Sequence, residues 1–306
     1  MESKLHISVS PHIRSKRNTR NIMLDVILSL LPATAAGIVL FGGSAVAVVV
    51  TCIAAAVLSE GFFNLIIKKE QTVNDLSAVV TGLLLALNLP ANIPLWQAVI
   101  GSVFAIVIVK CFFGGIGCNV VNPAITGRVF MLIAFGSMAQ AAFPVDSASA
   151  ATPLVELSQG NVPDLLELFL GKNGGAIGET SVLALLIGGI YLLARGVISW
   201  HLPVAYIGTV FLFTLAVQGD LTVTLAYIFS GGLFIGAIFM ATDYVTSPST
   251  PAGKLIFGIG AGVITVLIRL WGNYPEGVSF AILLMNILNP FIEKWTPRKL
   301  FGGKKA

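Results

Sequence analysis

The loop that begins at Asp146 contains the side chain with the clearest access for covalent chemistry. Small residues (146–151, DSASAA) precede the hydroxyl of Thr152 and leave space around it. The loop runs for roughly 35 residues between apolar segments without strong periodicity, and loops of this length are usually functional or disordered. A plain serine and alanine linker has the same composition. The residues alone therefore leave both interpretations open.

A second set of candidates consists of polar residues inside apolar segments or at their edges. Charge at membrane depth is costly, so such residues normally face a cavity or pair with each other. Asp75 and Asp243 flank two apolar segments that look interrupted, and together with Glu276 they are the candidates for an ion path. Many such residues also lie at membrane interfaces, where acids reach water, so that alternative stays open. The full set is Asp25, Glu60, Asp75, Asn122, Arg128, Asp243, Arg269 and Glu276.

The sequence predicts neither a metal site nor a phosphate-binding loop. The cysteines and histidines lack the spacing that zinc, an iron-sulfur cluster or a transmembrane haem requires, and the cysteines are expected to pack as apolar residues. They are Cys52, Cys111, Cys118, His6, His12 and His201. Two glycine-rich segments, 114–117 and 258–262, have neither a preceding strand nor a Gly-Lys-Ser/Thr ending. They indicate close helix packing instead.

Composition determines which elements must position these residues. The chain is 56% hydrophobic and 10% charged, with a mean hydropathy of +0.92. A membrane-spanning helix needs about 20 mostly apolar residues, and the runs here are continuous rather than alternating as in a barrel. The sequence therefore predicts an all-α polytopic membrane protein. Its ten expected spans are 22–41, 44–66, 76–90, 94–113, 122–140, 179–197, 200–217, 222–241, 253–271 and 277–293.

The ten spans divide into two halves that we expect to be inverted repeats. Five spans per half is an odd number, so a duplicated half must sit upside down relative to its mate. The third span is short and ends in Asn88-Leu89-Pro90, and the eighth runs into Thr242-Asp243, so both are interpreted as broken helices. The predicted organisation is a single membrane domain, 1–306. Its parts are an N-terminal tail (1–21), a first five-helix repeat (22–140), a loop with the candidate threonine (141–178), a second repeat (179–293) and a C-terminal tail (294–306).

The distribution of Lys and Arg predicts the orientation, because cytoplasmic loops carry the excess of positive charge. With both termini inside, only Lys172 and Arg269 of the 18 basic residues fall outside, and Lys110 and Arg128 count toward the cytoplasmic side. The loop with Thr152 is then extracytoplasmic. The net charge of +4 is explained by this topology and by anionic headgroups, so no nucleic-acid partner is predicted.

Several motifs together resemble a known family over nearly the whole chain. The chain is similar to the RnfD proteins of the Rnf electron-transport complex, which share ancestry with the NqrB proteins of the sodium-pumping NADH:quinone oxidoreductase. The motifs are residues 8–12 (SVSPH), 22–26 (IMLDV), 119–128 (NVVNPAITGR), 178–181 (GETS), 239–243 (FMATD), 246–248 (TSP), 274–277 (YPEG) and 284–286 (LMN).

The resemblance implies a covalent flavin at Thr152. In this family a flavin transferase outside the cytoplasm attaches FMN, through a phosphoester bond, to the threonine of an Asp-x-x-Ser/Thr-Gly/Ala-Ala-Thr motif. Asp146, Ser149, Ala150, Ala151 and Thr152 match it, with Ala150 at a position where glycine is commoner. Flavin accepts one or two electrons by itself, so the protein has only to hold and orient it. The resemblance also implies a second, noncovalent riboflavin within the membrane and a fold like that of urea transporters.

The resemblance further implies a role in a multi-subunit ion pump. The family's complex passes electrons between reduced ferredoxin and NAD while moving Na+ or H+ across the bacterial or archaeal cytoplasmic membrane. This chain would be one relay and not a complete enzyme, because it has no dinucleotide fingerprint and no cluster ligands. NAD binding, ferredoxin docking and iron-sulfur centres would belong to the partner proteins RnfA, RnfB, RnfC, RnfE and RnfG.

Two alternatives remain. The quinone-reducing NqrB proteins usually have a longer N-terminal extension, whereas only residues 1–21 precede the first expected span here, which favours the Rnf type. A solute channel or transporter without a redox role would use the same helices and inverted halves. A covalent flavin distinguishes the relay from the channel.

Overall fold

The computed structural model describes residues 18–136, 142, 152–171, 173–272 and 277–298. These residues form helices, together with one isolated bridge between Ala142 and Gly175. The helices in chain order are α1 (Thr19–Phe41), α2 (Gly43–Ile67), η1 (Val73–Asp75), α3 (Ser77–Leu87), α4 (Leu95–Val103) with its π-helical continuation η2 (Phe104–Cys111), α5 (Pro123–Ala134), α6 (Pro153–Ser158), α7 (Leu165–Leu170), α8 (Val182–Ala194), α9 (His201–Gln218), α10 (Leu221–Phe229), α11 (Leu233–Ile235) with its π-helical continuation η4 (Gly236–Met240), α12 (Pro251–Trp271) and α13 (Val278–Trp295).

The lengths of these helices bear on the predicted spans. Within the described residues, α1, α2, α9 and α12 are long and apolar enough to cross a membrane. A fifth candidate joins α10 to α11 and η4, with a bend of 64° between them. The other apolar helices, α3, α4 with η2, α5 and α8, are shorter. Helix occurs in each of the ten predicted segments, and the membrane class is confirmed, while the count of ten spans stays a prediction.

Neither of the two helices interpreted as broken or partial is a continuous helix of membrane-spanning length in the structure. α3 has only 11 residues and ends at Asn88. The eighth predicted span breaks at residues 230–232, between α10 and α11, and not at Thr242. Ser230 is extended and Gly231 has a φ of 67°, which ends α10 within the apolar run.

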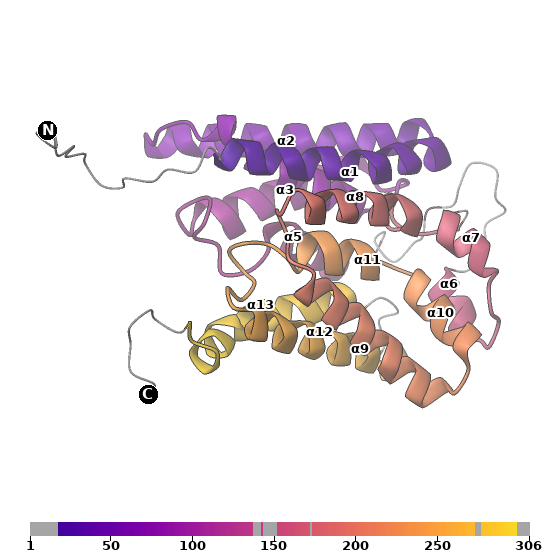
Figure 1. Cartoon of the computed structure of the whole chain (residues 1–306). Helices are drawn as coiled ribbons and strands as arrows, with labels where there is room; N and C mark the ends of the chain where they lie inside the picture. The colour runs from indigo at the N-terminus through magenta and orange to yellow at the C-terminus, as the bar shows by residue number, and fades with distance from the viewer. Residues whose placement is uncertain (1–17, 137–141, 143–151, 172, 273–276, 299–306) are drawn as a thin grey trace, which may run out of the picture.

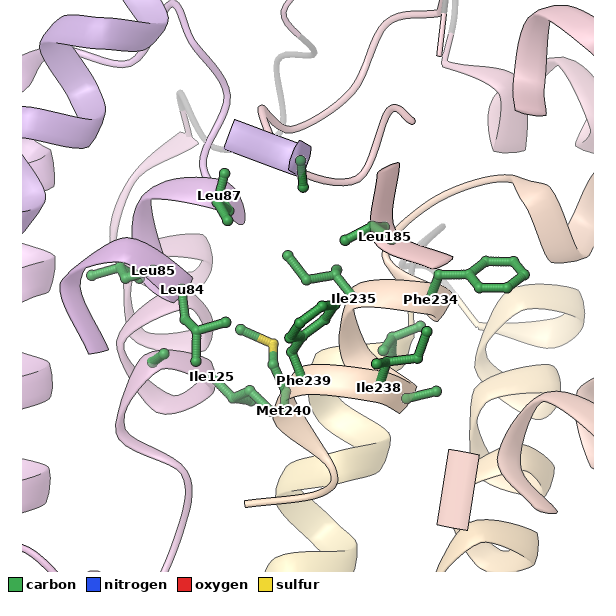
Figure 2. Packing of buried hydrophobic residues seen from close by; sticks show 14 of the residues in the cluster. Leu84, Leu85, Leu87, Ile125, Leu185, Phe234, Ile235, Ile238, Phe239 and Met240 are labelled. Carbon is green, nitrogen blue, oxygen red and sulfur yellow. The ribbon is translucent and has the colours of Figure 1, made fainter. Parts of the chain in front are cut away.

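One hydrophobic core joins the two halves of the chain. Figure 2 shows Leu84 of α3 and Met240 of η4 at its centre, with Phe239 and Ile235 beside them. The outward faces are also apolar: Val39, Leu58 and Ile133 are 82%, 70% and 70% exposed. Soluble monomers rarely expose apolar surface on this scale, so the outer faces fit a lipid environment.

The bundle has two distinct ends. α1 begins and α13 ends at one of them, whereas α6, α7 and the start of α10 lie at the other (Figure 1). Asp25 in α1 pairs with Arg195 at the end of α8, 3.1 Å apart, which places the end of α8 at the first end.

Two predictions about small residues need correction. Glycines 258 and 262 confirm close packing, because a Cβ at Gly258 would come within 2.9 Å of the Leu202 carbonyl oxygen in α9. Residues 114–117 instead form a turn, with φ of 121° at Gly114. Cys52 and Cys111 are buried as expected, but Cys118, which follows this turn, is exposed, so the prediction that it packs in the interior is wrong.

Candidate functional site

Thr152 lies at the N-terminal end of α6, at the end of the bundle opposite the start of α1 (Figure 1). Its backbone is extended, with φ −64° and ψ 151°, and its side chain does not cap the helix. The residue is half-buried, and its hydroxyl makes no hydrogen bond to any described residue. The other motif positions, Asp146, Ser149, Ala150 and Ala151, lie outside the described residues.

Apolar packing fixes α6, which begins at Pro153 directly after Thr152. Proline is favoured at the first helical position because its missing N–H would have no partner there. Leu154 and Leu157 are buried against Leu168 of α7 and Tyr227 of α10. Thr152 is thus attached to a short helix that packs on α10.

The break between α10 and α11 is stabilised by Arg269 of α12. Its guanidinium donates to the carbonyl oxygens of Tyr227, at 2.6 Å, and Ser230, at 3.1 Å. Carbonyls left free at a helix end inside a membrane protein need such donors. A Cβ at Gly231 would lie 2.8 Å from Leu154 Cδ1, so the helix that follows Thr152 packs directly against the break.

A buried ion pair lies beside the same break. Arg128 of α5 donates to Asn88 Oδ1 at 2.6 Å, and its guanidinium is 3.9 Å from Glu179 Oε1. Glu179 also accepts a hydrogen bond from the Ala176 N–H at 2.9 Å. A Cβ at Gly232 would come within 2.9 Å of Glu179 Oε2, so a larger residue there would displace the carboxylate at the start of α11. The end of α3 and the break in the second half therefore share one polar cluster.

A second contact joins the start of α5 to the end of η4 across the core. Asn122 caps α5 by accepting from the N–H groups of Ala124 and Ile125, and its amide donates to the Met240 carbonyl at 3.1 Å. Asn286 of α13 accepts from the Asn122 N–H at 3.1 Å once its amide is oriented to satisfy both of its partners. These contacts give a donor to the Met240 carbonyl at the end of η4 and an acceptor to backbone N–H groups at the start of α5.

Asp75 belongs to a separate network at the opposite end of the bundle from Thr152. Its carboxylate accepts from the Ser77 N–H at 2.7 Å and from the Ser77 hydroxyl. Ser77 Oγ in turn accepts from Lys110 Nζ at 2.6 Å, and Lys110 pairs with Glu60 at 2.9 Å. Thr72 completes the network by donating to Glu60 Oε1 at 2.6 Å. Hydrogen bonds thus link a half-exposed carboxylate to a buried ion pair.

Asp243 lies in the connection between η4 and α12. Thr246 donates to its carboxylate at 3.1 Å, and the Asn119 side chain also forms a hydrogen bond with it. Burial raises the pKa of the Asp243 carboxyl above its ordinary value, while these hydrogen bonds lower it. Asp75 and Asp243 are therefore in different networks, and Glu276 lies outside the described residues.

The polar residues of the predicted set that the structure describes do not pair with one another. Each has another polar partner, and Asp25, Glu60 and Arg128 form ion pairs with residues outside the set. The partners that sequence reasoning missed are Asn88 and Glu179, each at an edge of an apolar run, where they look like interface residues. The structure also buries Lys110 and Arg128, which are 3% and 6% exposed, although both count toward the cytoplasmic side in the charge distribution. Both pair with acids, so they carry less weight in predicting the orientation.

Together these features define a multi-pass helical membrane protein whose broken helices end on buried polar side chains. Residues 6–302 match the NQR2, RnfD, RnfE family, and the chain belongs to that family.

Similar proteins cover the chain almost end to end. The D-type subunit of the Na(+)-translocating ferredoxin:NAD(+) oxidoreductase complex of Acetobacterium woodii is 49% identical over 312 residues, which cover 99% of this chain and 97% of the relative. The D-type subunit of the proton-translocating ferredoxin:NAD(+) oxidoreductase complex of Clostridium ljungdahlii is 42% identical, with 98% and 96% covered. The D-type subunit of the ion-translocating oxidoreductase complex of Stutzerimonas stutzeri is also 42% identical, with 92% and 91% covered.

Proposed function

We propose that this protein is the RnfD component of an ion-translocating ferredoxin:NAD+ oxidoreductase complex and serves as one of its electron relays. The near full-length identity to the D-type subunits of complexes with that name carries the proposal. The partner proteins RnfA, RnfB, RnfC, RnfE and RnfG would provide ferredoxin docking, NAD binding and the iron-sulfur centres. The chain therefore belongs to a translocase that is catalytically complete only as an assembly.

Thr152 is the proposed attachment point of covalent FMN. The supporting observation is its hydroxyl, which makes no hydrogen bond to a described residue and precedes a helix packed against the α10–α11 break. FMN, when bound, supplies one- and two-electron transfer. The protein's part is to hold it, because Leu154 and Leu157 fix α6 and so limit the motion of Thr152. No residues are assigned to the second flavin, a noncovalent riboflavin.

The test of the flavin site is direct. The chain is produced with its flavin transferase, and the peptide 146–154 is expected to carry an FMN-sized addition on Thr152 by mass spectrometry. Thr152→Val should lose the fluorescent band on a denaturing gel. Thr222→Val, an exposed residue at the same end of the bundle, should keep it. A wild-type chain without a band, or a band that survives Thr152→Val, contradicts the relay and favours a solute channel.

The type of complex needs a separate assay, because the family includes the quinone-reducing NqrB proteins. The purified complex should reduce NAD+ with reduced ferredoxin, or run that reaction in reverse. Rapid NADH:quinone activity without ferredoxin activity would assign the chain to the NqrB type instead.

The two halves are proposed to be inverted five-helix repeats with ten spans and a urea-transporter-like fold. The packing supports this arrangement, because α2 packs against α3 and α4 as α9 packs against α10 and α12. Across the halves, α1 packs against α8 and α5 against α13, which an inverted two-fold relation would produce.

Both termini are proposed to be cytoplasmic in a bacterial or archaeal cytoplasmic membrane, with Thr152 outside. Support comes from the start of α1 and the end of α13, which lie at the opposite end of the bundle from Thr152 (Figure 1). An impermeant maleimide applied to intact cells should label Ser158→Cys, which is exposed at the end of α6. It should leave the native Cys118 unlabelled until the cells are opened, because the Gly114 carbonyl near Cys118 binds Lys69 at the other end of the bundle. The reverse pattern would invert the topology.

Asp75, Asp243 and Glu276 remain the proposed ion-path residues, with Na+ or H+ as the coupling ion. The supporting feature is that Asp75 directly precedes the short helix α3 and Asp243 follows the end of the broken segment at η4.

A further inference from the structure

A cavity of about 290 Å³ lies at the end of the bundle where α1 begins and α13 ends. Its walls come from the α8–α9 connection, from the segment between η4 and α12, and from the chain after α13. The α8–α9 connection starts at Arg195, which binds Asp25 of α1 and so places the cavity at this end. Neither the proposed flavin site nor the polar cluster at the α10–α11 break contributes to it.

Two cations from different walls line the cavity. Lys254, from the first turn of α12, donates to Ser199 Oγ at 2.9 Å. Arg298, after α13, donates to the Ser249 carbonyl at 3.3 Å. Neither cation forms an ion pair with a described carboxylate. The nearby Glu293 accepts from the Ser249 N–H at 2.9 Å and is not one of the lining residues. The cavity therefore holds an excess of positive charge.

A buried hydroxyl adds an open hydrogen-bond donor. Ser247 lines the cavity and is 9% exposed, yet its side chain forms no hydrogen bond to any described residue. The hydroxyl can therefore donate a hydrogen bond to a molecule in the cavity. α12 begins at Pro251 beside the cavity and adds the positive end of a 21-residue helix.

We infer that this cavity binds the phosphodiester headgroup of an anionic phospholipid. Two cations, a free hydroxyl and a helix N-terminus suit a phosphate group. Ligand pockets measure about 300–1,000 Å³, so a cavity at the lower limit admits a headgroup and not a dinucleotide. Trp200, Tyr244 and Trp295 are 55%, 56% and 74% exposed in the elements that form its walls. Exposed Trp and Tyr mark the headgroup level of a membrane, which favours a lipid over a soluble phosphate.

The test measures lipid binding by the full chain purified in detergent. Native mass spectrometry would follow the binding of added phosphatidylglycerol and phosphatidylcholine. Wild type should retain phosphatidylglycerol preferentially. The double variant Lys254→Gln/Arg298→Gln should bind it roughly 25-fold more weakly, since each charge near a membrane surface contributes about a fivefold gain. Lys294→Gln removes an exposed cation at the same end but outside the cavity, and should leave binding unchanged.

Three results would overturn the inference: equal retention by the double variant and wild type, equal binding of the two lipids, or binding of inorganic phosphate or glycerol phosphate as tight as that of phosphatidylglycerol. The last result would assign the cavity to a soluble phosphate. Lys254→Arg/Arg298→Lys keeps both charges and should restore binding. Ser247→Ala leaves the charges intact, so its expected weaker retention tests the cavity even if the double variant unfolds.

Discussion

Removal of Lys110 should destabilise the protein strongly, because it would leave Glu60 charged and buried. The two residues are 2.9 Å apart, and their side chains are 4% and 2% exposed. Among the described residues, Glu60 would keep only the hydrogen bond from Thr72. Breaking a buried ion pair by removing one partner costs about 3–5 kcal/mol. Such a loss lowers the melting temperature by about 2–4 °C per kcal/mol in chains of roughly 150–250 residues, so we expect Lys110→Met to lower it by roughly 6–20 °C.

The double variant Glu60→Gln/Lys110→Met separates the charge from the packing. It removes both charges and keeps a side chain that can accept from Thr72, so it should be more stable than Lys110→Met alone. Thermal unfolding of the purified chain in detergent, followed by tryptophan fluorescence, measures all four members of the cycle.

A pair whose cation is exposed provides the control for this cycle. Arg195 pairs with Asp25 but its side chain is 54% exposed, and Asp25 keeps the hydrogen bond from the Tyr191 hydroxyl at 3.0 Å, so Arg195→Gln should cost less than Lys110→Met. A Lys110→Met variant that melts within about 2 °C of wild type would refute a large cost for the unpaired carboxylate. A double variant that loses as much stability as the two single variants added together would refute the coupling between the two charges.

Three further predictions concern the break and the candidate ion path. Gly232→Ala would place a Cβ 2.9 Å from Glu179 Oε2 and should lower the free energy of unfolding by about 1–3 kcal/mol. Gly208→Ala in α9 has no atom within 4 Å of the added Cβ, so it should be neutral or stabilising. Equal effects of the two substitutions would contradict crowding at Gly232. Arg269→Met removes two charged hydrogen bonds to the carbonyls of Tyr227 and Ser230, each typically contributing about 1.5–3 kcal/mol. It should therefore lower the melting temperature more than Arg269→Lys does. An Arg269→Met variant as stable as wild type would show that these carbonyls need no donor. Asp243→Asn should reduce the number of ions moved per electron in proteoliposomes. Asp220→Asn, whose side chain can still cap α10, should leave that number unchanged. An unchanged number of ions per electron for Asp243→Asn would exclude Asp243 from the ion path.

The apolar segments are predictable because membrane insertion depends on a local property of the chain. A run such as residues 22–41 is apolar whatever surrounds it, and α1 forms there. An interruption of the eighth segment is also predictable, since Gly231 and Gly232 follow Ser230 within an apolar run. Its position is harder to predict, because residues 242–251 carry the more conspicuous polar and proline signals and favour a break there instead.

The sequence by itself determined the membrane class, the helical segments, the family and the one threonine that fits a flavin attachment motif. Only the tertiary structure decided that Asn88, Arg128 and Glu179 share one cluster beside Gly232. Asn88 and Glu179 lie at the edges of two apolar segments, where a polar residue most often meets water, whereas Arg128 lies within α5. Whether such a residue faces solvent or the core depends on how its helix is rotated and where the neighbouring helix breaks. Hydropathy along the chain contains no information about either, because both are determined by packing between segments distant in sequence.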